Sequence, residues 1–173
     1  MEKTAINKVK EMEIKNPTYH SAVLLVKDIK KSKHFYNVVL GQKIVMDFGR
    51  NVGFKGGFAI WEKGYALNLI FQEKAQEIKV GANNAEIYFE TEDLDNLYKR
   101  LVNEKSRVIH SIIEHPWGQR GFRIYDPDDH IIEFAESMES VVLRLHMKGF
   151  SFEEIAKKST MSTEFIKMVI QKH

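Results

Sequence analysis

The sequence contains one pattern twice: a short strand-like segment, then an aspartate, then an amphipathic helix. The segment SAVLLV leads to Asp28, and EIYFET leads to Asp93, 93 − 28 = 65 residues later. Each aspartate can accept hydrogen bonds from the free amides in the first turn of the following helix. Both helices are followed by short strand-like segments and turns, so the sequence predicts a tandem duplication of one βαβββ module.

The first module is predicted to contain one helix and then several short strands. The helix begins at Ile29 and ends at Gly41, because small and apolar residues recur every three or four positions. This stripe consists of Ile29, Ser32, Phe35, Tyr36 and Val39. The strand candidates that follow are KIVMDF, VGFK, FAIWEK and ALNLIF.

The second module repeats this order, and two such modules are expected to pack together. Its helix carries Leu94, Leu97, Leu101 and Val102, and its later strands are SRVIHSIIEH, GFRIYD and HIIEFAE. Side-by-side packing buries the sheet edges and leaves a cup between the modules. The expected fold class is α+β: two tandem βαβββ modules forming a concave mixed sheet, with helices outside and a three-helix C-terminal tail.

Composition excludes several classes of site and partner. Cysteine is absent, which excludes disulfides, thiol nucleophiles and thiolate metal sites. The 26 Lys and Arg against 24 Asp and Glu give a formal net charge of +2, too balanced to indicate a nucleic-acid or membrane partner. No apolar run reaches the roughly 20 residues of a membrane span, and the N-terminus lacks a signal peptide's apolar core, so we expect a cytoplasmic location.

Three regions are expected along the chain. Residues 1–18 form a charged N-terminal arm, residues 19–136 the paired βαβββ domain, and residues 137–173 a helical extension. In the extension, Ser151 and Glu154 form a capping-box pattern, and Ser162 starts a further helix. This arrangement is similar to a helix-turn-helix unit, but its second helix offers no arginine to read guanine. We therefore favour packing on the sheet or across a dimer over nucleic-acid binding.

Alternation in two strands of the second module places acidic side chains in the predicted cup. Glu86 and Tyr88 share one face of their strand. Glu133 lies between apolar neighbours in the last strand, where a carboxylate is costly without a partner. Two interpretations stay open: Glu133 binds a metal or moves a proton, or it forms an ion pair with Arg123 or Arg120.

Two stretches carry a resemblance to a known family. They are VLLVKDIKKSKHFYNVVLG in the first module and PWGQRGFRIYDPDDHIIEFAE in the second. They resemble the vicinal oxygen chelate superfamily, which includes glyoxalase I, bleomycin resistance proteins, extradiol dioxygenases and methylmalonyl-CoA epimerase. The resemblance covers residues 19–136. It implies paired βαβββ modules, a homodimer, and a divalent metal held by one side chain from the first and last strand of each module.

Carried over residue by residue, the resemblance supplies half of a metal site. In the second module the positions are Glu86 and Glu133, two oxygen ligands to which we also assign the catalytic role. In the first module they are Ser21 and Asn68, poor ligands for zinc or nickel, unless a strand slip brings His20 inward. The expected cofactor is at most one divalent ion (Zn, Ni, Mn or Mg), with Glu86, Glu133, His20 and Asn68 as candidate ligands.

Further side chains are candidates for contact with a substrate. Tyr88 and Arg123 lie on strands of the cup, and Trp117 lies with His115 in a loop that could close over a substrate. Trp61 could form an aromatic wall. For both tryptophans the alternative is ordinary packing, at the rim or in the core.

These residues support three hypotheses about function. The first is a glyoxalase-like, metal-dependent lyase or isomerase in which Glu86 or Glu133 moves a proton beside a carbonyl. The second is a protein that binds a drug or metabolite without a metal, which Ser21 and Asn68 favour. The third is a ligand-sensing regulator that uses the C-terminal helices. All three place a small molecule in the cup between the modules, an oxygenated one in the first hypothesis, and the sequence does not identify it.

Overall fold

The computed structural model describes residues 17–72, 77 and 79–173, so nearly all of the expected arm at residues 1–18 lies outside the described residues. The first module contains β1 (Ala22–Val26), α1 (Ile29–His34), the π-helical turn η1 (Phe35–Val39), β2 (Ile44–Asp47), β3 (Asn51–Phe54) and β4 (Phe58–Glu62). The second contains β5 (Glu86–Thr91), α3 (Leu94–Asn103), β6 (Arg107–Glu114), β7 (Arg120–Tyr125) and β8 (Ile131–Glu136).

Each module forms a four-stranded mixed sheet with the same strand order. The orders are β1-β4-β3-β2 and β5-β8-β7-β6, with the first and last strands of each module parallel and the other pairs antiparallel. Ala22 pairs with Phe58, and Ile87, 65 residues after Ala22, pairs with Ile132. The predicted α+β fold and its duplicated βαβββ modules are therefore confirmed.

One predicted strand is wrong, because ALNLIF forms most of helix α2 (Lys63–Phe71). Nearly every residue of this segment is apolar, so the sequence shows neither a strand period nor a helix period. Alanine and leucine are strong helix formers, and β1 already pairs with β4, which is the last strand of the module. Asn68, expected on that last strand, lies instead on the exposed side of a helix.

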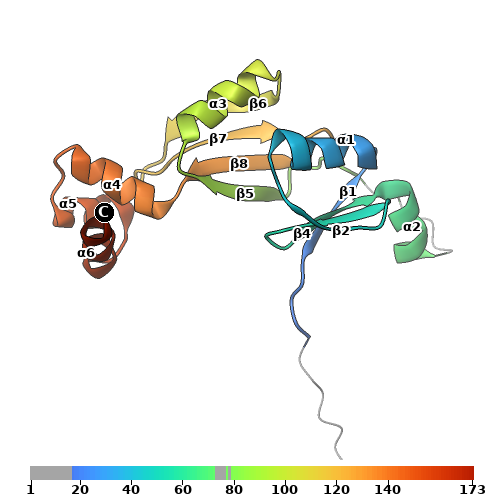
Figure 1. Ribbon diagram of the computed structural model, residues 1–173, viewed down its shortest axis with the longest axis horizontal. Helices are drawn as coiled ribbons and strands as arrows, with labels where there is room; N and C mark the ends of the chain where they lie inside the picture. The colour runs from blue at the N-terminus through green and yellow to red at the C-terminus, as the bar shows by residue number, and fades with distance from the viewer. Residues whose placement is uncertain (1–16, 73–76, 78) are drawn as a thin grey trace, which may run out of the picture.

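Helices α1 and α3 cover one face of the two sheets, as Figure 1 shows. The predicted cap is present at Asp28, which accepts hydrogen bonds from the amides of Lys30 and Lys31 at 3.0 and 3.1 Å. Asp93 also precedes its helix, but its side chain accepts no hydrogen bond from the backbone amides of that helix. One core is shared by both modules, and its largest fully buried members include Tyr36 and Phe122. We call the opposite side of the sheets the open face. It carries Val23, Trp61, Glu86, Tyr88 and Glu133.

A buried polar cluster fastens the two modules to each other. Asp128, in the turn between β7 and β8, accepts hydrogen bonds from the Lys27 amide at 2.9 Å and the Ser32 hydroxyl at 3.0 Å. In the same turn, Asp126 accepts one from the Tyr36 hydroxyl at 2.8 Å. Burial, and then the charge of Asp126, raise the pKa of Tyr36 far above its ordinary value, so Tyr36 stays a donor.

Three helices follow β8 and form a unit with its own core. They are α4 (Met138–Met147), α5 (Phe152–Ser159) and α6 (Thr163–Lys172), and we call them the C-terminal unit. Its fully buried side chains are Val141, Val142, Leu145, Ile155, Ile166 and Val169. The predicted capping box of Ser151 and Glu154 is present, and Ser162 caps α6. Among the described residues, no helix is long and apolar enough to cross a membrane.

Candidate functional site

The two glutamates predicted from the second module lie side by side on the open face, bridged by Arg123. The Arg123 Nε lies 2.9 Å from the Glu86 Oε2, and one terminal nitrogen lies 2.9 Å from the Glu133 Oε1. The other terminal nitrogen is 3.4 Å from the His110 Nε2. Glu86, Arg123 and Glu133 come from β5, β7 and β8. In these strands, side chains alternate between the two faces, so that Phe122 and Ile132 lie in the core and the charged side chains lie on the open face.

The environments of the two carboxylates differ, and so do their pKa values. The hydrogen bond from Arg123 holds the pKa of Glu86 below its ordinary value, outweighing partial burial. The side chain of Glu133 is only 10% exposed, and burial raises its pKa despite the charge of Arg123. Glu133 is therefore the carboxyl group of the pair that more readily holds a proton.

The residues present do not fit a four-ligand metal site. The strand register makes Ala59 of β4 the counterpart of Glu133, so the counterparts of the two glutamates in the first module are Ser21 and Ala59 rather than Ser21 and Asn68. The described β1–β4 pair keeps one register along its length, so no slip brings His20 inward. Over residues 17–72, 77 and 79–173, no group of three or more His, Asp or Glu is placed to hold a metal ion.

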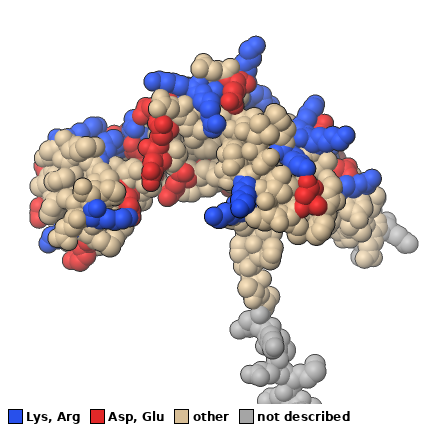
Figure 2. Space-filling model, viewed as in Figure 1, with Lys and Arg blue, Asp and Glu red and all other residues tan. Residues whose placement is uncertain are grey.

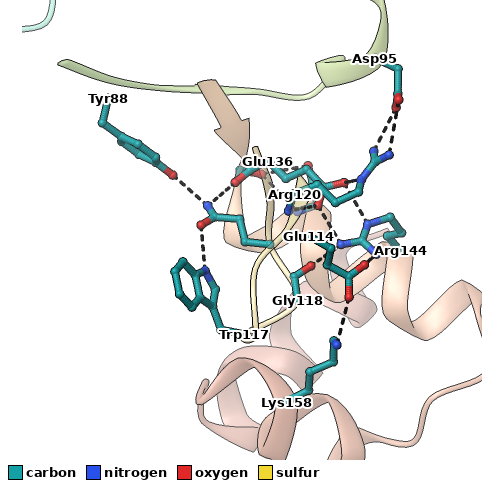
Figure 3. A network of polar contacts seen from close by, with 12 residues as sticks. Tyr88, Asp95, Glu114, Trp117, Gly118, Arg120, Glu136, Arg144 and Lys158 are labelled. Carbon is teal, nitrogen blue, oxygen red and sulfur yellow. Dashed lines mark hydrogen bonds and ion pairs between the residues drawn. The ribbon is translucent and has the colours of Figure 1, made fainter. Parts of the chain in front are cut away.

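A loop between β6 and β7 brings two predicted contact residues together. The amide nitrogen of Gln119 donates to the Tyr88 hydroxyl at 2.9 Å, and the Trp117 indole donates to the amide oxygen of Gln119 at 3.0 Å (Figure 3). The rings of His115 and Trp117 stack with centroids 4.5 Å apart. The His115 Nε2 lies 3.9 Å from the Glu133 Oε1 and, among the described residues, has no hydrogen-bond partner.

The surroundings of His115 favour its neutral form. Burial lowers its pKa, and the positive charge of Arg123 lowers it further. A neutral imidazole next to a carboxyl group with a raised pKa can accept a proton or share one. More widely, acidic side chains gather where the second module meets the C-terminal unit, as Figure 2 shows.

Trp61 lines a separate cleft on the first module. This cleft of about 490 Å³ lies between the sheet and α2, and its lining residues are Met46, Phe48, Arg50, Asn51, Trp61, Tyr65 and Leu69. The rings of Trp61 and Tyr65 meet edge to face at 6.3 Å, and the Arg50 guanidinium lies 5.0 Å from the centre of the Tyr65 ring. The cleft thus combines aromatic walls with one cationic group.

Two residues that line this cleft each carry a buried polar atom without a hydrogen-bond partner. The Asn51 Oδ1 and the Trp61 Nε1 have no hydrogen-bond partner among the described residues, although both are shielded from solvent. The two residues are direct neighbours across the β3–β4 pair. One is an acceptor and the other a donor, so two neighbouring residues of the cleft lining carry a matched pair of unused hydrogen-bonding groups.

The structure thus divides the predicted site residues between two places. Glu86, Glu133 and Arg123 cluster on the second module, with Tyr88 and Trp117 joined through Gln119 nearby, whereas Trp61 lies on the first. Gln119 and Asn51 were not among the residues predicted from the sequence. The turn at Gly56 and Gly57 was a usable signal for Asn51, because a hairpin closed there places residue 51 opposite residue 61.

Comparisons with known proteins agree with this architecture. The family model for the glyoxalase-like domain matches residues 19–139. A protein of unknown function from Agrobacterium tumefaciens is 37% identical, with a TM-score of 0.64, covering 73% of this chain and 98% of that chain. No curated protein matches.

Two more distant structures share the fold. A glyoxalase/bleomycin resistance protein/dioxygenase from Nocardioides is 18% identical, with a TM-score of 0.57, over 72% of this chain and 86% of that chain. A lactoylglutathione lyase from Agrobacterium tumefaciens is 19% identical, with a TM-score of 0.55, over 71% and 96%. The C-terminal unit lies almost wholly beyond the matched domain. On this evidence the chain belongs to the glyoxalase-like domain family of the vicinal oxygen chelate superfamily.

Proposed function

We propose that the protein binds a small planar organic molecule in the Trp61 cleft and does so without a resident metal ion. The observation that carries this proposal is the pair of buried, unpartnered atoms, the Asn51 Oδ1 and the Trp61 Nε1. A buried polar group without a hydrogen bond costs about 1–3 kcal/mol. A ligand that supplies both missing partners, after the two side chains turn toward it, would recover that cost, and this recovery would favour binding in the cleft.

The lining of the cleft points to the chemical class of the ligand. A carboxamide or lactam carries an N–H donor for the Asn51 oxygen and a C=O acceptor for the Trp61 indole on one planar group. Trp61 and Tyr65 offer ring faces and edges for an aromatic ring attached to that group. Arg50, already over the Tyr65 ring, adds attraction for an electron-rich ligand.

The second module supports binding rather than metal-assisted chemistry. Its two carboxylates already share the guanidinium of Arg123, and the counterpart positions Ser21 and Ala59 offer no strong ligand. These positions do not supply the ligand set that a metal-dependent lyase or isomerase step would need. This choice corresponds to the second of the three hypotheses drawn from the sequence.

Three related neutral probes test the proposal: benzamide, acetophenone and toluene. They present a donor with an acceptor, an acceptor alone, and neither. The Trp117→Phe variant keeps Trp61 as its single tryptophan, so its fluorescence reports on the cleft. We expect benzamide to bind most tightly, and Asn51→Leu to weaken benzamide about tenfold while leaving toluene unchanged. Equal affinity for all three probes, or no binding at millimolar concentration, would contradict the proposal.

A second candidate function is proton transfer by Glu133, favoured by the raised pKa of this buried carboxyl group and by the unpartnered His115 Nε2 3.9 Å away. In that case the protein would exchange the proton beside the carbonyl of a small hydroxyketone with solvent. Proton NMR of dihydroxyacetone in heavy water measures this exchange. Glu133→Gln should abolish it and Glu90→Gln, on the same face, should not; exchange that survives Glu133→Gln rejects this candidate.

A further inference from the structure

The loop between β6 and β7 contacts the helices of the C-terminal unit. This loop carries His115, Trp117 and Gln119. Within the loop, the His115 amide donates to the Gln119 carbonyl and the Gly118 amide to the His115 carbonyl, each at 2.8 Å. These bonds shape the turn, and the Gln119 side chain ties it to the sheet through the Tyr88 hydroxyl and the Glu136 carbonyl, at 2.9 and 2.7 Å. Contacts with α4 and α5 provide a second support, from the C-terminal unit (Figure 3).

Arg144 of α4 makes the central contact. It donates to the Gly118 carbonyl and forms two parallel hydrogen bonds to Glu136, of 2.9 and 2.8 Å. Glu136 is buried, and it also accepts from the backbone amide and the Nε of Arg120, at 3.0 and 2.8 Å. A buried carboxylate with two arginines is a rigid anchor, because each fork fixes both distance and orientation. Arg144 thus ties the loop to that anchor.

Lys158 of α5 adds a second contact on the same loop. Its ammonium lies 3.0 Å from the Glu114 carboxylate, where the loop begins. A Cβ atom at Gly118 would lie 2.9 Å from the Lys158 Cε and 3.4 Å from the Leu145 Cδ1. The loop therefore lies directly against two helices of the C-terminal unit, and a side chain at Gly118 would have to displace the end of Lys158.

From these contacts we infer that Arg144 is a positioning residue through which the C-terminal unit sets the loop carrying His115 and Trp117 over the open face. Gln119 extends the connection to Tyr88, so four residues of the face are linked to a guanidinium from outside the matched domain. By linkage, a ligand that displaces the loop also changes the stability of α4, and a ligand whose affinity for the helices depends on the Arg144 contacts also changes the loop. This inference does not rest on occupancy of the Trp61 cleft.

The test removes Arg144 from an otherwise folded chain. In a Trp61→Phe background, Trp117 is the only tryptophan, so its fluorescence anisotropy reports on the loop. Arg144→Met keeps the aliphatic stem and removes the hydrogen bonds. We expect lower anisotropy and about tenfold faster amide exchange at Gly118. The control is Lys172→Met, which makes the same charge change in an exposed ion pair with Glu139 in the same unit.

Two more variants keep the result decisive. Arg144→Lys restores the charge beside Glu136 but not the planar fork that also reaches the Gly118 carbonyl, so the loop should stay loosened. Full rescue by lysine would show that only charge matters and would overturn the positioning role. If Arg144→Met does not fold, the Lys158→Met variant replaces it as the test of whether the C-terminal unit positions the loop. We expect the same loss of Trp117 anisotropy in that variant. Unchanged anisotropy and exchange in a folded variant would refute the inference.

Discussion

Replacing Arg123 by methionine should destabilise the protein mainly by leaving Glu133 charged and unpaired. Glu133 is 10% exposed at the side chain and depends on Arg123 at 2.9 Å. Breaking a buried ion pair costs about 3–5 kcal/mol, but Arg123 is itself 25% exposed, so water compensates part of the loss. The Glu86 contact is more exposed and adds little. We expect a loss of about 3 kcal/mol, which lowers Tm by about 6–12 °C for a chain of this size.

Glu133→Gln on top of Arg123→Met distinguishes this explanation from simple loss of packing. The double variant removes the buried charge and should recover about 2 kcal/mol of the loss, as measured by urea unfolding. Arg50→Met is the control, because the Arg50–Glu62 pair is long, at 3.8 Å, and exposed. Additive effects of the two substitutions, or a control that costs as much as Arg123→Met, would refute the reasoning.

The destabilisation should also depend on pH, with a definite sign. Burial already raises the pKa of Glu133, and loss of Arg123 should raise it further. A carboxyl group whose folded pKa is raised favours the folded state when it is protonated. That contribution is complete below the unfolded value of about 4.3 and is lost as pH rises through the folded value. The gap in Tm between wild type and Arg123→Met should therefore narrow as pH falls, and a gap that widens would contradict the assignment.

Three other perturbations follow from the structure. Asp128→Ala leaves the Lys27 amide and the Ser32 hydroxyl unpaired between the modules and should cost about 2–3 kcal/mol in urea unfolding, whereas a neutral result would mean that the cluster does not fasten them. Burial opposes ionisation of Glu136, but hydrogen bonds from arginines outweigh it and lower its pKa, so the stability it provides is present above its ordinary pKa and is lost on acidification. Glu136→Gln should therefore reduce the fall in Tm at acidic pH. An unchanged fall would show that other groups cause it. Ser162→Ala removes the cap of α6 and should cost about 1 kcal/mol, seen as faster amide exchange in that helix alone; a change spread over the whole chain would point elsewhere.

The duplication and the facing of the strands could be predicted from sequence because both depend on short-range periodicity. Alternation correctly placed Glu86 and Tyr88 on one face of their strand, and it placed Glu133 on the other face of its strand from the core residue Ile132. The prediction failed at Asn68, where an all-apolar segment carries no period and only the pairing of β1 with β4 decides which strand comes last. The local pattern was sufficient to predict an element and its faces where one face is polar. It was insufficient where neither face is polar.

The partners of the site residues depend on long-range register, which one sequence does not reveal. Arg123 and Arg120 were equal candidates for Glu133, and the choice depends on which residue of β7 lies opposite residue 133 of β8. Likewise, nothing local connects Arg144 with Gly118, 26 residues earlier in the chain. The same limit explains why Gln119, central to the loop, was missed.

The buried aspartate cluster between the modules also restricts which motions could open the domain to a ligand. Asp126 and Asp128 are almost fully enclosed, and one hydrophobic core runs through both halves of the domain. A clamshell motion of one half against the other would expose that core and break the cluster's hydrogen bonds together, so it is far costlier than rearranging a peripheral segment. For a ligand that binds as we propose, entry and release would therefore take place at the periphery, at α2 on the first half or at the β6–β7 loop on the second.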